Sequence, residues 1–456
     1  MYKKVHFIGI GGIGMSGIAQ LFLAQGVQVS GSDIRDSERL QELRQNGAQI
    51  YIGHHPSHIK DVDLVVYSSA IKEDNPELEE AQKRGFKVVK RAEALAEIIQ
   101  HGKVITVSGS HGKTTTTSLV AHILFEAGFY PTVVVGGIWL NLNSNAYLGK
   151  DNFFVIETDE SDGSFLFFKP DYSIITNIDY EHLDYYKNFD RLLDSFNNFI
   201  ENIKPAGCLI ACGEDKNVFS LLNKASKRKV IYGLSPEYDI YAYDINLKRL
   251  FSDFNCTYAR HFTERFMLSL GGVHNVLNSL AAIALAKELE IDLEIVKRAL
   301  LSFKGTRRRI EIKADIQGVL FIDDYAHHPT EIKATLKTVA NLGYKRVIAV
   351  FQPHRYTRTK LLLDEFAQSF YLADEVIITD IYPADEKPIE GINAELLYER
   401  FKFYKHPAVK FLPKKEIADC LLNSIKTGDL LITLGAGDIY KTNEELVQRF
   451  KERFEK

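Results

Sequence analysis

A glycine-rich segment that ends in a lysine and a threonine carries the strongest chemical signal in the chain: Gly109, Ser110, His111, Gly112, Lys113 and Thr114. It follows the apolar run 104–107 and leads into a helical pattern from Thr115 to about Ala127. A strand, a glycine turn and a helix N-terminus form a phosphate cradle, because backbone N–H groups and the helix dipole favour an anion there. Lys113 can reach the outer phosphates, and the Thr114 hydroxyl can hold Mg²⁺. The segment therefore predicts an enzyme that uses a nucleoside triphosphate.

The phosphate-loop pattern is a shortened form in this chain. The full pattern places a glycine five positions before Gly112, and Val107 stands there. The alternative is a glycine turn that happens to precede a helix starting with Lys-Thr. The prediction therefore depends on the strand before the loop and the helix after it.

Polar residues follow two further apolar strands of the same region. The run 153–156 ends at Glu157, and the run 172–176 leads to His182. Ligands of parallel α/β sheets bind beyond the carboxyl ends of the strands, so both side chains are candidates to meet Thr114 around the phosphates. A carboxylate, a hydroxyl and phosphate oxygens suit Mg²⁺, and an imidazole could complete a second ion. The alternatives are a solvated loop carboxylate for Glu157 and a surface or capping role for His182.

A second glycine motif stands at the start of the chain. Residues 9–14 fit G-x-G-x-x-G after the strand 4–8, and Asp33 ends the next strand. This is the dinucleotide-binding fingerprint, in which the backbone approaches a pyrophosphate at a helix N-terminus. NAD, FAD and UDP-sugars all contain a pyrophosphate. The motif therefore predicts a bound diphosphate more firmly than it predicts NAD.

Basic and aromatic residues gather after two strands of the last third of the chain. The strand 319–322 runs into residues 323–329, and the strand 346–351 runs into residues 352–358, which include Arg355 and Arg358. The planar fork of arginine matches a carboxylate in bidentate fashion. This region is predicted to hold an anionic small molecule; a basic surface loop is the alternative. Asn275, which opens an Ala/Leu-rich helix, could read a base edge, although a capping role is favoured for it alone.

Composition limits the class of protein. The 456 residues are 45% hydrophobic and 25% charged, typical of a soluble globular protein of two to four domains. A net charge of −4 leaves no excess positive field, so nucleic acid is not expected as a partner. Four cysteines without a metal-site spacing predict small core residues in a reducing compartment. No signal-peptide layout or membrane-length apolar run is found, so we expect a cytoplasmic protein with no membrane partner.

Alternating strands and helices predict an α/β protein of three domains. We expect a Rossmann-like domain over 1–100, a central P-loop ATPase-type domain with a mostly parallel sheet over 101–308, and a second Rossmann-like domain over 309–456. A diphosphate site, a Mg-nucleotide site and a carboxylate site suit one reaction type. ATP phosphorylates a carboxylate on a nucleotide-linked substrate, and an amine then attacks the acyl phosphate, with water excluded by a closing cleft.

At this level of detail the chain resembles the Mur ligase family. The resemblance rests on motifs that run in order from residue 8 to 438: residues 8–16, 109–117, 157–162, Thr176 and Asn177 leading to His182, Gly272 with His274, Asn275 and Asn278, Arg308 and Arg309, residues 323–329, 353–358 and 435–438. Each motif is weak alone, and together they are highly specific. The resemblance implies an ATP-dependent reaction that joins L-alanine to the lactyl carboxylate of UDP-N-acetylmuramate and releases ADP and phosphate, in peptidoglycan precursor synthesis.

The resemblance also implies a role for each matching residue. It places the UDP diphosphate on Gly11, Gly12, Ile13, Gly14, Met15 and Ser16, with Asp33, Ser68 and Ser69 near the uridine and sugar. It places ATP on Gly109, Ser110, His111, Gly112, Lys113, Thr114, Thr115, Asn275, Arg309 and Asp324. It assigns Mg²⁺ to Thr114, Glu157 and His182, and it places alanine by Tyr325, His327, Arg355 and Arg358. The residues expected to act in catalysis are Lys113, Glu157, His182 and Arg309.

The chain departs from the family pattern at two positions. Ser110 replaces a more usual threonine, and Ala326 replaces a frequent glycine. Both replacements are small residues, so we expect no change in chemistry. A carbamylated lysine, present in some sister ligases, is not predicted. The alternatives are a ligase that recycles a preformed murein tripeptide onto the same acceptor, an NAD-dependent oxidoreductase, and a non-enzymatic nucleotide switch. The expected assembly is a monomer or a homodimer.

Overall fold

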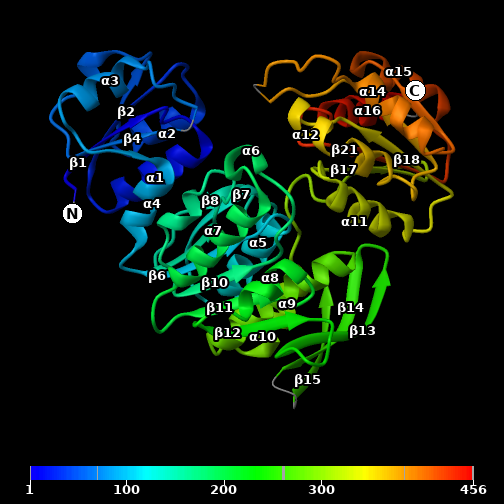
Figure 1. Ribbon diagram of the computed structural model, residues 1–456, viewed down its shortest axis with the longest axis horizontal. Coiled ribbons are helices and arrows are strands. Elements are labelled where there is room, and N and C mark those ends of the chain that lie inside the picture. The colour runs from blue at the N-terminus through cyan, green and yellow to red at the C-terminus, as the bar shows by residue number, and fades with distance from the viewer. Residues whose placement is uncertain (1, 69, 259–261, 385, 454–456) are drawn as a thin grey trace. The chain divides into compact units, whose positions relative to one another are not determined.

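The computed structural model describes residues 2–68, 70–258, 262–384 and 386–453 of the chain (Figure 1). Its strands form three sheets. The chain folds into two compact units, and each is described by itself. The first comprises Met1–Tyr243, Cys256–Glu264 and Leu277–Ser302; the second comprises Asp244–Asn255, Arg265–Val276 and Phe303–Lys456. The predicted boundaries near 100 and 308 fall between the sheets and stay predictions.

The N-terminal sheet is fully parallel, with strand order β3-β2-β1-β4-β5. Its elements are β1 (Lys4–Ile8), α1 (Ile13–Ala24), β2 (Gln28–Asp33), α2 (Glu38–Gln45), β3 (Gln49–Ile52), η1 (Pro56–His58), β4 (Leu64–Tyr67), α3 (Pro76–Lys83), β5 (Val88–Lys90) and α4 (Arg91–Ile99). The four last residues of β1 are buried, because helices cover the sheet. A parallel sheet brings the carboxyl ends of its strands to one edge, which here carries the glycine motif. The predicted strand at 4–8 and the predicted strand that ends at Asp33 are confirmed.

A ten-stranded sheet follows, with order β15-β14-β13-β12-β11-β10-β6-β9-β7-β8. Its elements are β6 (Lys103–Ser108), α5 (Lys113–Glu126), β7 (Thr132–Trp139), β8 (Ser144–Tyr147), β9 (Phe153–Glu157), η2 (Ser164–Phe167), β10 (Tyr172–Ile175), α6 (Leu183–Tyr186), α7 (Phe189–Glu201), β11 (Cys208–Cys212), α8 (Lys216–Leu222), β12 (Arg228–Gly233), β13 (Ile240–Lys248), β14 (Phe251–Tyr258), β15 (Phe262–Leu268), α9 (Val273–Glu288) and α10 (Leu293–Ser302). Strands β9, β6, β10 and β11 are mutually parallel, and β7 pairs antiparallel with β8.

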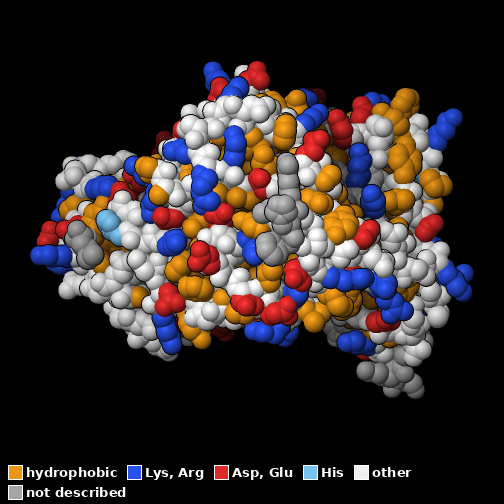
Figure 2. Space-filling view, turned by 90° about the horizontal axis from the view of Figure 1, so that it is seen from below, with side chains coloured by type: hydrophobic (Ala, Val, Ile, Leu, Met, Phe, Trp, Pro, Cys, Tyr) orange, Lys and Arg blue, Asp and Glu red, His pale blue; other side chains and the backbone are white. Residues whose placement is uncertain are grey.

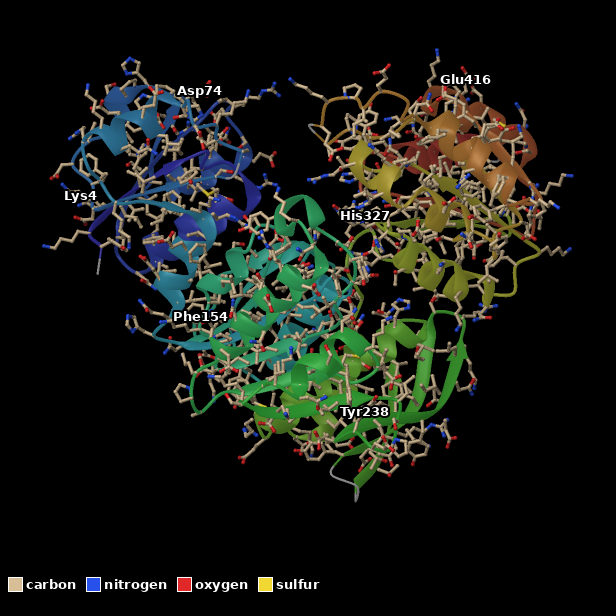
Figure 3. The ribbon with its side chains drawn as sticks, viewed as in Figure 1. Lys4, Asp74, Phe154, Tyr238, His327 and Glu416 are labelled. Atoms are coloured by element: carbon tan, nitrogen blue, oxygen red, sulfur yellow. The ribbon has the colours of Figure 1, made fainter. Side chains whose placement is uncertain are left out.

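The centre of this sheet is apolar, which fits its position between helices. Phe154, which is labelled in Figure 3, is a buried residue of β9. Cys208 and Cys212 on β11 are buried, and burial raises the pKa of each thiol to about 11. A thiol with a raised pKa is a poor nucleophile and a poor metal ligand. These cysteines therefore serve as small core residues.

The C-terminal sheet has the order β16-β17-β21-β18-β19-β20 and is parallel except for the β16–β17 pair. Its elements are β16 (Glu311–Ile316), β17 (Val319–Asp324), α11 (Pro329–Ala340), β18 (Arg346–Phe351), α12 (Tyr356–Leu361), α13 (Leu363–Ala367), β19 (Glu375–Ile378), α14 (Ala394–Phe403), β20 (Val409–Phe411), α15 (Lys414–Ser424), β21 (Asp429–Leu434) and α16 (Tyr440–Glu452). Alternate residues of β17 enter two separate apolar clusters: Ile322 packs with residues of α11, and Phe321 with residues of α16. Helices therefore cover both faces, and the predicted α/β class is confirmed.

The surface is mixed in charge. On the face shown in Figure 2, Lys and Arg side chains are interspersed with Asp and Glu side chains. This matches the near balance of 56 basic and 60 acidic residues in the sequence. Among the described residues, no helix combines the length and the apolar character needed to cross a bilayer.

Candidate functional site

The phosphate loop lies between the end of β6 and the start of α5, as the sequence predicts. Gly109 and Gly112 have φ values of +129° and +82°, which favour glycine. A Cβ atom at Gly109 would overlap the Thr176 hydroxyl, and one at Gly112 would lie 2.6 Å from Asn278 Oδ1. The backbone N–H of His111 donates to Asn177 Oδ1 at 2.8 Å. The loop is therefore shaped by its own glycines and held by residues that follow β10.

The N-terminus of α5 is suited to an anion. Gly112 caps the helix and has no side chain to accept the first N–H groups, and no acidic residue lies in the first turn. Backbone donors and the helix dipole therefore remain directed at the loop. The next ten residues after Thr114, from Thr115 to Leu124, are all buried, which fixes the helix against the sheet.

Lys113 forms a buried ion pair inside the loop. Its ammonium lies 2.7 Å from Glu160 Oε1 and donates to the carbonyl of Gly109 at 2.5 Å. Burial opposes its charge, yet the carboxylates of Glu160, Glu157 and Glu181 raise the pKa of Lys113 above its ordinary value. The lysine is thus held charged at the position where phosphates are expected.

Glu160 is a residue that the sequence analysis did not single out. Its side chain is 1% exposed, and Oε2 has no hydrogen-bond partner among the described residues. The residue lies in a tight turn, in which Gly163 donates its backbone N–H to the Glu160 carbonyl at 3.1 Å. Its place in the acidic run 157–162 is a sequence signal, but the turn that directs it at Lys113 depends on the fold.

Thr114 and Glu157 are brought together. The Thr114 hydroxyl donates to Glu157 Oε1 at 2.9 Å, and the backbone N–H of Gly136 on β7 donates to Oε2 at 2.5 Å. His182 Nε2 lies 3.8 Å from Glu160 Oε1 and 3.8 Å from Glu181 Oε2. A hydroxyl, several carboxylates and an imidazole therefore converge around Lys113. This donor set fits Mg²⁺, which prefers oxygen ligands, and the unpartnered Glu160 oxygen adds to the fit.

The N-terminal glycine loop is built around β2. Gly9 and Ile10 donate their backbone N–H groups to the Ser32 carbonyl at 2.9 and 3.0 Å, and Gly11 donates to Asp33 Oδ2 at 2.9 Å. The Asp33 carboxylate thus supports the loop. Gly12 caps α1, whose first turn, from Ile13, holds no acidic residue.

The remaining predicted residues of this loop region differ in how far the structure describes them. Met15 and Ser16 are buried in α1. The Ser68 backbone N–H donates to the Ile8 carbonyl at 3.1 Å, which places Ser68 at the same sheet edge as the glycine loop. Ser69 lies outside the described residues.

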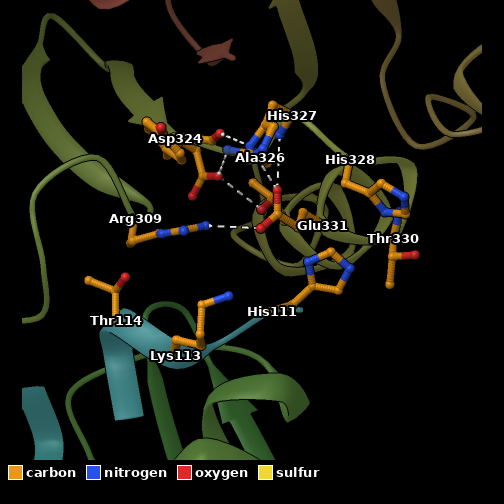
Figure 4. Close-up of polar contacts among 12 residues, drawn as sticks. His111, Lys113, Thr114, Arg309, Asp324, Ala326, His327, His328, Thr330 and Glu331 are labelled. Carbon is orange, nitrogen blue, oxygen red and sulfur yellow. Dashed lines mark hydrogen bonds and ion pairs between the residues drawn. The ribbon is translucent and has the colours of Figure 1, made fainter. Parts of the chain in front are cut away.

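In the second unit, Figure 4 shows Asp324 beside Ala326 at the end of β17, and Arg309 directed at Glu331. Asp324 accepts from the backbone N–H of Ile310 at 2.7 Å and of Ala326 at 2.8 Å, and burial raises its pKa to about 6. Arg309 Nη1 lies 3.4 Å from Glu331 Oε1. Glu331 also accepts from the His327 backbone N–H at 3.0 Å. His327, just beyond β17, is also labelled in Figure 3.

Two further side chains of this unit have hydrogen-bond partners within the same unit. Asn275 donates its amide to the Gly271 carbonyl at 2.8 Å, the local contact that its position at the start of α9 favours. Arg308 bonds Asp323 Oδ2 at 2.8 Å and the Gly437 carbonyl at 3.0 Å. Arg308 therefore joins the ends of β17 and β21, and the basic run at 307–309 is more than a solvated face.

The aromatic and basic residues of the last third also come together. The His354 ring stacks on Tyr382 at 5.6 Å and meets the His327 ring edge-on at 5.6 Å. Arg358 Nη1 lies 3.3 Å from His354 Nδ1. Burial, with the nearby charges of His327 and the arginines, lowers the pKa of His354 to about 3. His354 is thus neutral at physiological pH.

Arg355 and Tyr325 complete this group. Arg355 begins α12 with φ +70°, a strained conformation for a residue with a side chain, and strain of this kind clusters at functional sites. It forms no ion pair with any described carboxylate. The Tyr325 ring lies 5.2 Å from the guanidinium of Arg309 and 5.2 Å from the His327 ring. The group therefore combines the guanidinium of Arg355 with aromatic surface.

A phosphate loop at the carboxyl edge of a mostly parallel sheet, with lysine, hydroxyl and carboxylates converging on it, defines a nucleotide-dependent α/β enzyme. Three family models match the chain in order: the Mur ligase family catalytic domain over residues 4–103, the Mur ligase middle domain over 107–286, and the Mur ligase glutamate ligase domain over 308–437. The chain belongs to the Mur ligase family.

Curated relatives match over almost their whole length. The UDP-N-acetylmuramate--L-alanine ligase of Desulfatibacillum aliphaticivorans is 46% identical, covering 98% of this chain and 99% of the relative. The protein of the same name from Geotalea daltonii is 45% identical, covering 99% and 98%.

Solved structures show the same fold. The UDP-N-acetylmuramate-alanine ligase MurC of Thermotoga maritima has a TM-score of 0.81 at 30% identity, covering 99% of this chain and 100% of that one. A murein peptide ligase from Psychrobacter arcticus has a TM-score of 0.69 at 26% identity, covering 98% of each. The chain therefore has the three-domain α/β fold of the Mur ligases.

Proposed function

We propose that this protein is an ATP-dependent ligase that joins L-alanine to the lactyl carboxylate of UDP-N-acetylmuramate, through an acyl phosphate, in peptidoglycan precursor synthesis. ADP and phosphate are the other products. The observation that carries the proposal is the cluster of Lys113, Thr114, Glu157, Glu160 and His182 around one phosphate loop. Support for the acceptor and the amino acid comes from full-length relatives of that name at 44–46% identity.

The roles of the residues follow from their chemistry. Phosphoryl transfer needs mainly positioning and charge neutralisation. The N-terminus of α5, which follows the loop of residues 109–112, and the Lys113 ammonium would neutralise the phosphates of ATP, with Arg309 as a further cation. Thr114, Glu157 and His182 would hold Mg²⁺, which when bound neutralises phosphate charge. Asn275 and Asp324 are the proposed further ATP contacts.

The acceptor and the amine need separate positioning. The loop of residues 11–16, with Asp33 and the turn at Ser68 and Ser69, would hold the UDP part of the acceptor. The Arg355 and Arg358 guanidinium groups would hold the alanine carboxylate, with Tyr325 and His327 beside them. The domain boundaries at 100 and 308 and a cytoplasmic location are part of the same proposal, as is an assembly of one or two copies.

The test is phosphate release by the full chain with ATP, Mg²⁺ and UDP-N-acetylmuramate, with and without L-alanine, followed by mass analysis of the nucleotide product. The proposal expects alanine-dependent release and a product heavier by one alanyl residue. Release with a preformed murein tripeptide and none with L-alanine would assign the chain to the recycling ligases. The alanine ligase is favoured because the structural match to MurC is closer, with a TM-score of 0.81 against 0.69.

A further inference from the structure

Arg91, the first residue of α4, lies on the N-terminal glycine loop. Gly14 is in the first turn of α1, and a Cβ atom there would overlap Arg91 Nη1 and lie 3.1 Å from Cζ and 3.2 Å from Cδ. The guanidinium and its stem therefore occupy the space that the missing side chain leaves. In the general fingerprint the third glycine allows close packing of helix and strand. In this chain the space is filled by a cation.

This arginine is partly buried, and it has no hydrogen bond or ion pair with any residue that the structure describes. Two other arginines of the first unit have carboxylate partners: Arg44 pairs with Asp36 at 2.9 Å, and Arg228 pairs with Glu288. Holding a guanidinium partly out of water without a partner has a free-energy cost. A group outside the chain is therefore expected to complete its hydrogen bonds.

The topology directs Arg91 to the edge where the predicted diphosphate lies. It follows β5 directly, and β5, β4 and β1 are parallel neighbours, so the carboxyl ends of these strands share one edge of the sheet. At that edge the loop offers backbone N–H groups and an uncapped helix N-terminus, while Asp33 adds a negative charge bound to Gly11. A diphosphate carries about two negative charges, and backbone dipoles alone do not balance them.

We propose that Arg91 binds the diphosphate of the UDP-linked acceptor, as the charged partner of the loop of residues 11–16. The planar guanidinium fork can donate two parallel hydrogen bonds to phosphate oxygens. The inference rests on the proposed function, because it takes the diphosphate as the ligand of this loop. It names a binding residue that the glycine motif does not contain.

The first test compares binding constants of wild type and Arg91→Ala for three ligands, UDP, UDP-N-acetylglucosamine and UDP-N-acetylmuramate, by calorimetry. We expect Arg91→Ala to weaken all three by the same factor, about tenfold to a hundredfold, since each contains the diphosphate. Arg91→Lys should retain part of the affinity. Lys83→Ala on α3 removes an exposed positive charge from the same domain and should change affinity less than twofold.

A double mutant tests the contact itself. Gly14 has an ordinary negative φ, so Gly14→Ala adds a methyl group without backbone strain and displaces the Arg91 guanidinium. If both residues act through one contact, Gly14→Ala/Arg91→Ala binds UDP no more weakly than Arg91→Ala alone. Losses that add would mean that the new methyl group blocks the ligand directly, which would count against the assigned contact.

Two results would overturn the proposal. Unchanged UDP affinity in Arg91→Ala would exclude a role in diphosphate binding, and a loss confined to UDP-N-acetylmuramate would assign Arg91 to the lactyl carboxylate. A failure of the proposed function is a different outcome: wild type would then bind no uridine nucleotide and release no phosphate with L-alanine. Thermal unfolding of each variant checks that the fold is retained.

Discussion

At the scale of single residues, the Lys113–Glu160 pair makes the phosphate loop sensitive to the loss of either charge. Removal of the lysine leaves Glu160 buried beside Glu157 and Glu181 without its cation. Breaking a buried pair from one side costs about 3 kcal/mol, mostly because the remaining charge is unpaired. The pair therefore contributes to stability as well as to the proposed chemistry.

We predict that Lys113→Ala abolishes alanine-dependent phosphate release, lowers the urea midpoint of unfolding, and leaves UDP-N-acetylmuramate binding intact. Lys113→Ala/Glu160→Gln should stay inactive but regain most of the lost stability, because the amide at position 160 carries no charge that needs the lysine. Urea unfolding and phosphate release measure the two effects separately. Turnover of Lys113→Ala at the wild-type rate would refute the phosphate-loop assignment.

Arg355 is the second residue whose role can be separated from stability. Its guanidinium has no carboxylate partner among the described residues, so its removal leaves no buried charge behind. We predict that Arg355→Ala raises the KM for L-alanine about tenfold to a hundredfold, through the loss of a charge-assisted contact to its carboxylate. The KM for ATP should stay within twofold. Lys360→Ala, an exposed cation on the same helix, is the matched control.

Initial rates at varied alanine and varied ATP separate these effects. Equal increases in both KM values would contradict the assignment of Arg355 to alanine, and would indicate a general disturbance of the second unit.

At the scale of elements, a buried carboxylate joins β1, β2 and the loop after β3 to α3. Glu77, in the first turn of α3, is fully buried and bonds Ser32 Oγ at 2.5 Å and His58 Nδ1 at 2.6 Å. His6 and His54 lie 3.5 and 3.4 Å from the same carboxylate. The Ser32 carbonyl holds the glycine loop, so Glu77 supports the element that carries the diphosphate site.

The pKa of Glu77 gives a testable pH dependence. Burial alone would raise this pKa, but hydrogen bonds from His6, Ser32 and His58 outweigh it and lower the pKa from 4.5 to about 2. A depressed pKa contributes stability that is fully present above pH 4.5 and is lost as the pH falls toward 2. We predict that Glu77→Gln lowers stability at pH 7 by about 1–3 kcal/mol, with a smaller difference from wild type below pH 4.

Urea unfolding of wild type and Glu77→Gln between pH 3 and pH 7 checks this. A difference that stays constant over this range would mean that the Glu77 charge is not what stabilises the domain.

The elements that could be predicted from the sequence are those with a strong local signal. The strand before the phosphate loop, the strand that ends at Glu157 and the strand predicted at 319–322 all occur, because each combines an apolar run with turn residues at its end. The meander β13–β15 was not predicted. The residues of β13 alternate between more buried and more exposed positions, so the strand contains no continuous apolar run. It also carries no chemical motif.

The candidate site was predictable where strand ends determine it. Thr114 and Glu157 meet because the carboxyl ends of parallel strands lie at one edge of the sheet. This contact can be predicted without knowing the conformation of any loop. Glu160 and Arg91 were missed for the opposite reason. Each depends on the path of a turn or on the packing of one helix against another, and neither is encoded by spacing along the chain.

At the scale of the whole molecule, the proposed ATP contacts are divided between the two compact units. Lys113, Thr114 and Glu157 belong to the first unit, and Arg309 and Asp324 to the second. The proposed function places all of them on one ATP molecule, so we expect the two units to be closed around the ligands when ATP is bound. Such closure would also exclude water from the acyl phosphate, which otherwise hydrolyses.

We therefore predict that a non-hydrolysable ATP analogue with Mg²⁺ and UDP-N-acetylmuramate decreases the radius of gyration measured by small-angle X-ray scattering. Arg309→Ala should reduce or abolish this decrease, because it removes the contact from the second unit, while Lys360→Ala should leave it unchanged. Calorimetry establishes that the analogue is bound in each case. If saturating ligand left the radius of gyration of wild type unchanged, either the units are already closed without ligand or the nucleotide contacts one unit alone. Crosslinking between a cysteine introduced at the exposed Arg307, which leaves Arg309 in place, and one introduced near Lys113 separates those two cases. Units that are already closed without ligand would crosslink in the absence of the analogue, and a nucleotide that contacts one unit alone would give no crosslink in either condition.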